Sequence, residues 1–200
     1  ANPYTLTDDD RTVIGNTTPK FSGGFGLNAT FKGFDVSAFF NFMYDFDVFN
    51  ANKVMMTTWA SNNYNNFSMD ISAAKRWRNF DDMGNEIRYS PEILAEFNKN
   101  ATMWNPTSIG RPIAMSYAVE DGSFLRLNTA TIGYTLPRAW TNKVGLSRVR
   151  FYASGYNLFT ITGYSGYDPE VDIATGLTPN IDNNRYPRSR TYTFGVQLTF

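Results

Sequence analysis

The 200-residue sequence predicts an all-β fold, namely a segment of a transmembrane antiparallel β-barrel with long extracellular loops. Three observations predict it: strands with one apolar face, connections that alternate between short and long, and no apolar run long enough for a membrane helix. Residues 188–200 form the clearest strand, because apolar and polar side chains alternate strictly there. The apolar set is Tyr192, Phe194, Val196, Leu198 and Phe200. We expect a closing barrel strand whose last aromatic residue faces lipid.

The composition fits a barrel and argues against several other classes of protein. A membrane helix needs about 20 mostly apolar residues, whereas the longest apolar stretch, Val36 to Phe49, is broken by Asp45 and Asp47. A barrel strand is apolar only at every second residue, so a negative mean hydropathy is compatible with it. The 18 basic and 18 acidic residues balance, which argues against nucleic acid as a partner. Because the chain has no Cys and no His, we expect no catalytic site, metal site or cofactor.

Alternation of apolar and polar residues predicts four further strands. The first two form a hairpin around a tight turn at residues 32–35. In the next strand the apolar residues change face between Leu127 and Ala130, which predicts a β-bulge near Asn128. In the strand after that, Asn157 falls on the apolar face, and the pattern does not explain it. These four strands are expected at 21–31, 35–46, 124–136 and 148–161.

The connections alternate in length, as in membrane barrels with short periplasmic turns and long extracellular loops. A soluble β-sandwich would also show alternating strands, but it seldom needs so long a connection as the one after residue 46. The expected division is an extracellular loop at 1–20, a barrel hairpin at 21–46, a long extracellular loop at 47–121, a barrel strand at 122–136, a periplasmic turn at 137–147, a barrel strand at 148–161, an extracellular loop at 162–187 and the closing strand at 188–200.

Five strands cannot close a barrel, since known membrane barrels have about eight or more. An open sheet in lipid would leave two rows of backbone groups without hydrogen-bond partners. We therefore expect the remaining strands on an N-terminal portion or on another chain. The first residues also lack the pattern of an export signal, so we expect that signal upstream of Ala1.

Motifs in the second half of the chain resemble a known family. They are EDGSFLRL at 120–127, GYTLP at 133–137, NLFT at 157–160, GYDPE at 166–170 and RTY at 190–192. In this order they resemble the C-terminal end of SusC/RagA-type TonB-dependent transporters of Bacteroidetes, and residues 10–16 and 19–21 resemble the approach to an earlier strand. The resemblance implies a barrel of roughly 22 strands in the outer membrane, with an N-terminal plug absent from this chain. It also implies a SusD-like surface lipoprotein as a lid, the TonB complex as energy source, outer-membrane lipid around the barrel and the barrel-assembly machinery as partners.

The function that this resemblance implies is import of a nutrient too large for porins, either glycan or peptide. The alternative is a SusC-like barrel that serves as a structural scaffold in a larger outer-membrane complex. The apolar residues from Tyr192 to Phe200 would be the signal that the barrel-assembly machinery reads.

Aromatic residues of the loops are the candidates for contact with substrate or lid, because aromatic rings stack on sugars and hold peptide side chains. The alternative is that they build a small core for the long loop, with a short helix at Pro91–Asn98 after Ser90. The candidates are Trp59, Tyr64, Trp77, Tyr89, Trp104, Tyr164 and Tyr167.

Polar residues of the strands are expected to face inward, toward a wet lumen or the plug. They offer either a hydrogen-bonding path for substrate or, as we favour, packing and solvation. In the loop after residue 161, the carboxylates of Asp168, Glu170 and Asp172 are ligands of the kind that Ca²⁺ accepts. Because the rest of a calcium-binding pattern is missing, we interpret them as a solvated loop. The inward set is Ser22, Asn28, Thr30, Ser37, Asn41, Thr129, Thr131, Arg148, Arg150, Tyr152 and Ser154.

Overall fold

A computed structural model describes residues 11–59, 66–107, 114–171 and 179–200. The chain forms two compact units. We call Ala1–Val48, Glu120–Ile181 and Arg185–Phe200 the wall unit, and Phe49–Val119 with Asp182–Asn184 the loop unit.

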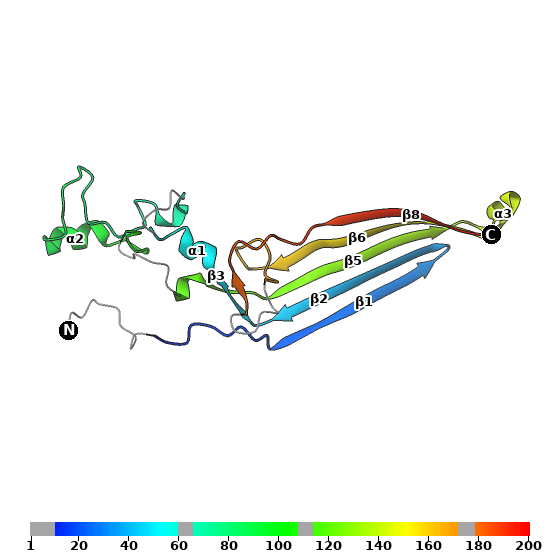
Figure 1. The fold of residues 1–200 in the computed structure, drawn as a ribbon, viewed down its shortest axis with the longest axis horizontal. Coiled ribbons are helices and arrows are strands. Elements are labelled where there is room, and N and C mark those ends of the chain that lie inside the picture. Colours follow the sequence, from blue (N-terminus) through cyan, green and yellow to red (C-terminus); the bar gives the residue numbers. More distant parts are fainter. Residues whose placement is uncertain (1–10, 60–65, 108–113, 172–178) are drawn as a thin grey trace. The chain divides into compact units, whose positions relative to one another are not determined.

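The wall unit is built on one five-stranded sheet in the order β1-β2-β5-β6-β8. All neighbouring strands are antiparallel, and they lie side by side in Figure 1. The shortest strand has 9 residues and the longest 15, and a membrane-crossing strand needs about 9 to 11. The expected transmembrane β-sheet is thereby confirmed. The strands are β1 (Phe21–Phe31), β2 (Phe34–Tyr44), β5 (Phe124–Thr135), β6 (Arg148–Thr162) and β8 (Thr191–Thr199).

The register of the strands places most of their apolar residues on one side, which we call the outer face; Phe39, Met43 and Phe124 are exceptions on the other side. One row across the sheet shows this: Phe34 pairs with Tyr134, Tyr134 with Phe151, and Phe151 with Val196. The side chains of this face are open, with Phe31 69% and Phe194 80% exposed. None of its paired positions in the described strands is charged. A face of this kind is suited to contact with lipid.

The polar residues of the five strands share the opposite side, which we call the inner face. In one row Asn28 pairs with Ser37, Ser37 with Thr131, and Thr131 with Ser154. The Thr131 and Ser154 hydroxyls lie 2.8 Å apart and hydrogen-bond across β5 and β6. The separation of the two faces that alternation predicts is therefore present across the whole sheet.

The first hairpin turns on two residues, Lys32 and Gly33, with φ angles of 46° and 89°. Positive φ at both central residues matches the right-handed twist of the strands that they join. The turn is shorter than predicted, because Phe34 and Asp35 already pair within β2. We call this end of the sheet the turn end, and the opposite end the loop end.

Two bulges interrupt the register. Phe39 pairs with Thr129 and Phe40 with Leu127, so Asn128 is the extra residue of β5, and the predicted bulge is confirmed. Opposite it, β6 pairs through Tyr156 and Phe159 and leaves Asn157 with Leu158 unpaired to β5. Asn157 has a φ of 51°, a left-handed conformation that asparagine tolerates better than most residues. This second bulge explains why Asn157 departs from the alternation.

The second predicted strand ends two residues early. Asp45 has a φ of 61°, which breaks the extended backbone after Tyr44 and turns Phe46 into a small core at the loop end. There the Phe46 and Phe124 rings meet edge to face, with centroids 6.4 Å apart. The buried members of this core are Phe46, Val48, Phe124, Tyr164 and Val171.

The connections contain more regular structure than alternation alone predicts. The link at the turn end holds α3 (Arg138–Thr141) and η4 (Asn142–Val144), and it closes on Gly145 at a φ of 72°. Three short strands form a second sheet in the order β4-β3-β7. They are β3 (Asp47–Asn50), β4 (Val119–Asp121) and β7 (Ile181–Asp182).

The long loop after β3 is a folded unit with its own helices. The helix predicted at residues 91–98 is confirmed, with Pro91 in its first turn, although the Ser90 side chain makes no capping hydrogen bond. No helix among the residues described has both the length and the apolar character needed to cross a membrane. The helices of this unit are α1 (Ala51–Met55), η2 (Met69–Ile71), α2 (Pro91–Asn98) and η3 (Ser116–Ala118).

Candidate functional site

A buried arginine organises the loop end of the wall unit. Arg126 lies on the inner face of β5, paired with Asn41 on one side and Thr160 on the other. Its side chain is 2% exposed, and its guanidinium donates to Asp168 Oδ1 at 2.5 Å. A Glu170 carboxylate oxygen lies 3.6 Å away, and the guanidinium carbon is 5.6 Å from the centre of the Phe124 ring. The strand thus anchors a loop 42 residues further along the chain.

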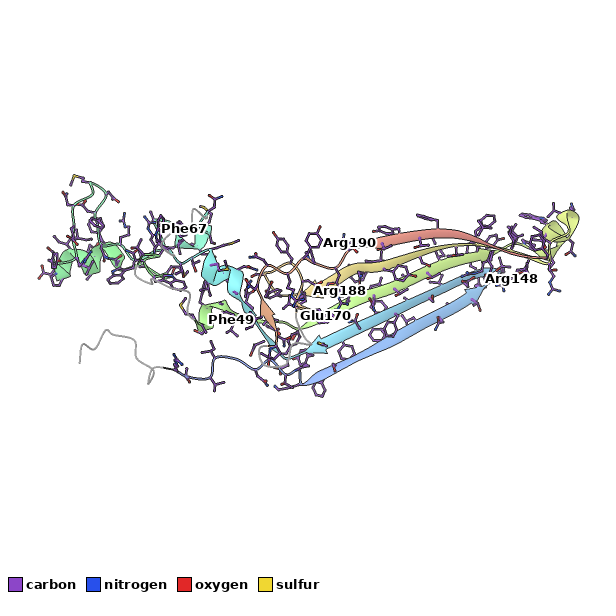
Figure 2. All side chains as sticks on the ribbon, in the orientation of Figure 1. Phe49, Phe67, Arg148, Glu170, Arg188 and Arg190 are labelled. Atoms are coloured by element: carbon purple, nitrogen blue, oxygen red, sulfur yellow. The ribbon has the colours of Figure 1, made fainter. Side chains whose placement is uncertain are left out.

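The same loop is fixed from its other side by Arg188, which precedes β8. Arg188 donates to Glu170 at 2.7 Å through its side chain and to Asp168 at 3.4 Å through its backbone N–H. The backbone N–H of Glu170 also donates to Asp168, at 3.0 Å. Figure 2 shows Glu170 and Arg188 together at the loop end, with Arg148 at the opposite end of the sheet. We call Arg126, Asp168, Glu170 and Arg188 the charged latch.

The latch keeps Asp168 ionised. Burial alone would raise the pKa of Asp168, but the hydrogen bond from Arg126 and those from the backbone outweigh it, and the pKa lies below the usual range. The interpretation of Asp168 and Glu170 as a solvated loop is therefore wrong, because both side chains are largely buried and held by arginines. In the described ranges, no three carboxylates gather as metal ligands would. Asp172 lies outside the described residues.

The segment before β5 ties the same loop down with neutral donors. Ser165 donates to the Glu120 carboxylate at 2.9 Å from its backbone and at 2.8 Å from its hydroxyl. The Thr162 hydroxyl donates to the Ser123 carbonyl at 2.8 Å, and the Ser123 hydroxyl accepts from the backbone N–H of Asp45 at 2.8 Å. The EDGS motif thus joins three connections of the wall unit into one rim.

The aromatic candidates in the loop unit fall into two groups. Trp59, Trp77 and Tyr89 are exposed, by 47%, 40% and 80%. The Trp59 ring lies 5.7 Å from the ring of Phe67. Tyr64 lies outside the described residues. The exposed rings are free of the core and accessible to a ligand or a partner.

Trp104 belongs to the second group, because it is partly enclosed in a polar and aromatic cluster. Its indole N–H donates to the Thr57 carbonyl at 3.0 Å, and its ring meets Tyr117 edge on at 5.1 Å. The Tyr117 hydroxyl donates to Asp70 at 3.0 Å, and the Lys53 ammonium lies 4.6 Å from the centre of the Tyr117 ring. Hydrogen bonds from Tyr117 and Ser68 hold the pKa of Asp70 below its usual range.

Tyr164 and Tyr167 differ sharply although only two residues separate them. Tyr164 is 6% exposed and packs in the core with Phe46 and Val171, whereas Tyr167 is 83% exposed. Its buried ring gives Tyr164 a packing role. Among the predicted aromatic candidates in the described residues, the accessible ones are therefore Trp59, Trp77, Tyr89 and Tyr167.

The turn end of the inner face is flat because large side chains lie over glycines. Arg150 reaches across β5 to form a two-point ion pair with Asp35, with one bond of 2.9 Å. A Cβ at Gly133 would lie 2.5 Å from the Arg150 guanidinium, so a larger residue there would force the Arg150 side chain to move. On the other side, a Cβ at Gly195 would lie 2.4 Å from the Tyr152 ring. The Arg150 and Tyr152 side chains therefore lie flat along the inner face over β5, β6 and β8.

A sheet with one apolar and one polar face, formed by strands long enough to cross a bilayer, defines the wall of a transmembrane β-barrel. The comparisons with known proteins agree. No family model matches the chain. It is 32% identical over 201 residues to TonB-dependent receptor P3 of Formosa agariphila, covering 98% of this chain and 18% of that protein. It is also 32% identical over 164 residues to TonB-dependent receptor SusC of Bacteroides thetaiotaomicron, covering 75% of this chain and 15% of SusC.

Among solved structures, the RagAB peptide importer in its closed-closed state matches 98% of this chain and 19% of its own, at 25% identity and a TM-score of 0.73. The open-open state matches over the same share of both chains, with a TM-score of 0.69. The chain thus spans less than a fifth of the length of these relatives. It belongs to the SusC/RagA family of TonB-dependent outer-membrane proteins, as a segment of the barrel.

Proposed function

We propose that the parent protein imports a nutrient too large for porins, and that this chain supplies wall strands and outer loops of the importer. The observation that carries the proposal is the two-faced sheet, which has an apolar outer face and a mainly polar inner face. We propose that the outer face meets lipid and that the inner face lines a wide lumen. The relatives are named TonB-dependent receptors, and the solved neighbours are described as a peptide importer. They support a transport role for the barrel to which this segment contributes.

The cargo and the partners extend this proposal. We propose a peptide or a glycan as cargo, a SusD-like lipoprotein as lid and the TonB complex as energy source, acting through parts of the parent outside this chain. Cargo is captured under the lid, and TonB then displaces the plug; no bond is made or broken by these residues. The exposed Trp59, Trp77, Tyr89 and Tyr167 are proposed to contact cargo or lid, since aromatic faces bind sugars and peptide side chains alike.

The orientation is also a proposal. The turn end would face the periplasm and the loop end the outside, because membrane barrels keep their short connections in the periplasm. The outer-face residues from Tyr192 to Phe200 would then present the recognition signal for the barrel-assembly machinery. Substitution of Phe200 by Asp in the full-length parent should reduce its surface level; an unchanged level would remove this role.

The proposal is tested by purification of the full-length parent from outer membranes, with mass spectrometry of all that copurifies. A SusD-like lipoprotein with bound peptide or glycan supports the importer and identifies its cargo. A larger assembly without a small-molecule ligand would overturn it in favour of the scaffold role.

Uptake by cells that carry Trp77→Ala provides the second test. We expect reduced uptake from Trp77→Ala, whereas Trp140→Ala should leave uptake unchanged. Trp140 is a matched control because it is also exposed, by 61%, but follows β5 at the turn end. Loss of partner assembly with normal uptake would again favour the scaffold.

A further inference from the structure

A hollow of about 320 Å³ opens at the turn end of the wall unit. Its polar strand residues come from four neighbouring strands, and all of them belong to the inner face. Thr30 lies on β1, Asp35 on β2, Thr135 on β5 and Arg148 on β6. The hairpin turn, with Lys32, completes the lining. The hollow therefore gathers residues with two cationic, two hydroxyl and one carboxylate group.

Arg148 is the charged residue of the inner face that lacks an ion pair; Figure 2 labels it at the turn end. In the described strands, the paired positions of the inner face that carry a charge are Asp35, Arg126, Arg148 and Arg150. Arg126 pairs with Asp168, and Arg150 pairs with Asp35. Among the residues that the structure describes, no carboxylate lies within ion-pair distance of Arg148, and its guanidinium reaches the Thr135 hydroxyl at 3.5 Å.

Asp35 does not supply the missing partner, although it lines the same hollow. Both of its carboxylate oxygens accept from the Arg150 guanidinium, Oδ1 at 2.9 Å. Arg148 is attracted by this carboxylate but forms no ion pair with it. Lys32 lies against the Phe31 ring, at 5.2 Å from its centre. Three cations and one carboxylate at this end therefore leave the hollow with an excess of positive charge.

The chemical group that fits the hollow is a carboxylate. The planar guanidinium of Arg148 offers N–H donors in a fork that matches two carboxylate oxygens, and the hydroxyls of Thr30 and Thr135 can donate to the same group. A phosphate fits less well, because it would bring a second negative charge beside Asp35. An unpaired guanidinium on a strand that crosses a membrane also needs a partner.

We propose that this hollow binds a carboxylate of a polypeptide inside the lumen, with its oxygens held by Arg148 and by the two threonine hydroxyls. The inference rests on the proposed function, because it needs the inner face to line the lumen. The carboxylate comes either from an acidic side chain of the parent outside this chain or from a peptide cargo. This chain spans less than a fifth of its relatives, so both sources enter the test.

The test is carbodiimide cross-linking of the full-length parent in isolated outer membranes, with mass spectrometry of the joined peptides. Carbodiimide couples a carboxylate to an amine only where the two groups touch, and Arg148→Lys places an amine at the hollow while it keeps the charge. The matched control is Gln197→Lys, because Gln197 pairs with Arg150 on the inner face of β8 and does not line the hollow. We expect roughly tenfold more cross-linking from Arg148→Lys, since the control position lacks the charge-assisted hydrogen bonds of the hollow.

The cross-linked partner identifies the source of the carboxylate. A cross-link from position 148 to an acidic residue of the parent outside this chain supports the site with an internal partner. A cross-link to a separate peptide supports the site with cargo as the partner. Cross-links to Asp35 alone, no cross-link at position 148, or equal yields from Arg148→Lys and Gln197→Lys would each overturn it.

A second amine keeps the inference testable if Arg148→Lys does not reach the outer membrane. Lys32 of the unchanged parent lines the same hollow, whereas Lys143 belongs to the same end and does not line it. Cross-links from Lys32 that exceed those from Lys143 support the site, and equal yields overturn it. Uptake by the same cells reports on the proposed function: normal uptake without a cross-link removes only the site, and a cross-link without uptake removes only the import role.

Discussion

The two ends of the inner face carry their charges in different surroundings. At the loop end, Arg126 is 2% exposed and binds Asp168 away from water. At the turn end, Asp35 and Arg150 are 32% and 18% exposed, and their pair joins β2 to β6 in partial contact with solvent. Desolvated charges depend on their partners far more than hydrated charges do. The latch should therefore be the part of the wall unit most sensitive to loss of a single charge.

The largest effect is expected from Arg126→Ala. Its removal leaves Asp168 and Glu170 largely buried beside each other, and loss of one partner of a buried ion pair costs about 3 to 5 kcal/mol. Thermal unfolding of the full-length parent, with limited proteolysis of the loop after β6, measures this. Arg188→Ala is the control, because its side chain is 46% exposed and its ion pair contributes about 1 kcal/mol or less. Equal losses for the two variants would contradict the contrast between buried and hydrated charge.

A smaller effect should follow from a change of pH. Asp168 has a lowered pKa in the folded protein, whereas an unfolded Asp titrates near about 3.9. The carboxylate therefore stabilises the latch fully above that unfolded value, and this contribution is lost as the pH falls through the lower folded value. The free energy of unfolding of the parent should therefore decrease when the pH is lowered from neutral to below the pKa of an unfolded Asp. The Asp168→Asn variant should be less stable at neutral pH and less dependent on pH, and a parallel slope for variant and wild type would refute this.

The loop unit offers an intermediate case. Asp70 accepts a hydrogen bond from Tyr117 at 3.0 Å, and its side chain is 49% exposed. Tyr117→Phe removes that donor and keeps the ring against Trp104, so we expect a loss of about 1 kcal/mol in local stability. Hydrogen exchange of the backbone around η2 and η3 measures it. A loss of stability as large as that from Arg126→Ala would show that burial of the charged group does not determine the size of the effect.

The smallest effect is expected at the turn end. Asp35→Asn removes the hydrated ion pair with Arg150 and should change the unfolding free energy by about 0.5 kcal/mol. A double-mutant cycle with Arg150→Gln isolates the pair from the packing of the Arg150 side chain over Gly133. A coupling energy of several kcal/mol would mean that this end is as desolvated as the latch.

The alternation of apolar and polar residues made most of the sheet predictable. In a strand, successive side chains point to opposite faces, so apolar and polar residues alternate along the sequence. When the apolar residues move from odd to even positions, the simplest structural cause is one extra residue in the strand. The move between Leu127 and Ala130 therefore predicted the bulge at Asn128. The bulge at Asn157 was harder to predict, because it contains two unpaired residues, and the alternation therefore continues unchanged after it. Its sequence signal is the asparagine itself, a residue that accepts positive φ.

The latch could not be predicted in the same way. Its partners lie 42 residues apart, and alternation carries no information about which loop side chain meets which strand. The sequence analysis did not single out Arg126, and it interpreted Asp168 and Glu170 as a solvated loop. The signal that could have found the latch is Arg126 itself, because a charge on a strand that crosses the membrane needs a partner.

The loop unit shows a further limit. Trp59, Trp77 and Trp104 are the same residue type in one segment, yet two are exposed and the third is partly enclosed beside Tyr117. Their difference comes from a network of Lys53, Asp70 and Tyr117 that spans more than sixty residues of chain, as the 4.6 Å approach of Lys53 to the Tyr117 ring shows. The composition shows that this loop is rich in aromatic residues. It does not predict which rings are exposed, because that depends on how the loop folds.

The glycines beneath Arg150 and Tyr152 also determine how far these two side chains stand out from the inner face. A side chain that points straight out from a sheet extends from it by its full length. A side chain that lies flat over Gly133 or Gly195 extends from it only by the thickness of a planar group. At this end the inner face therefore presents the flat sides of a guanidinium and of an aromatic ring. A Cβ at either glycine would push its neighbour away from the sheet, so the absence of two side chains keeps this part of the inner face low.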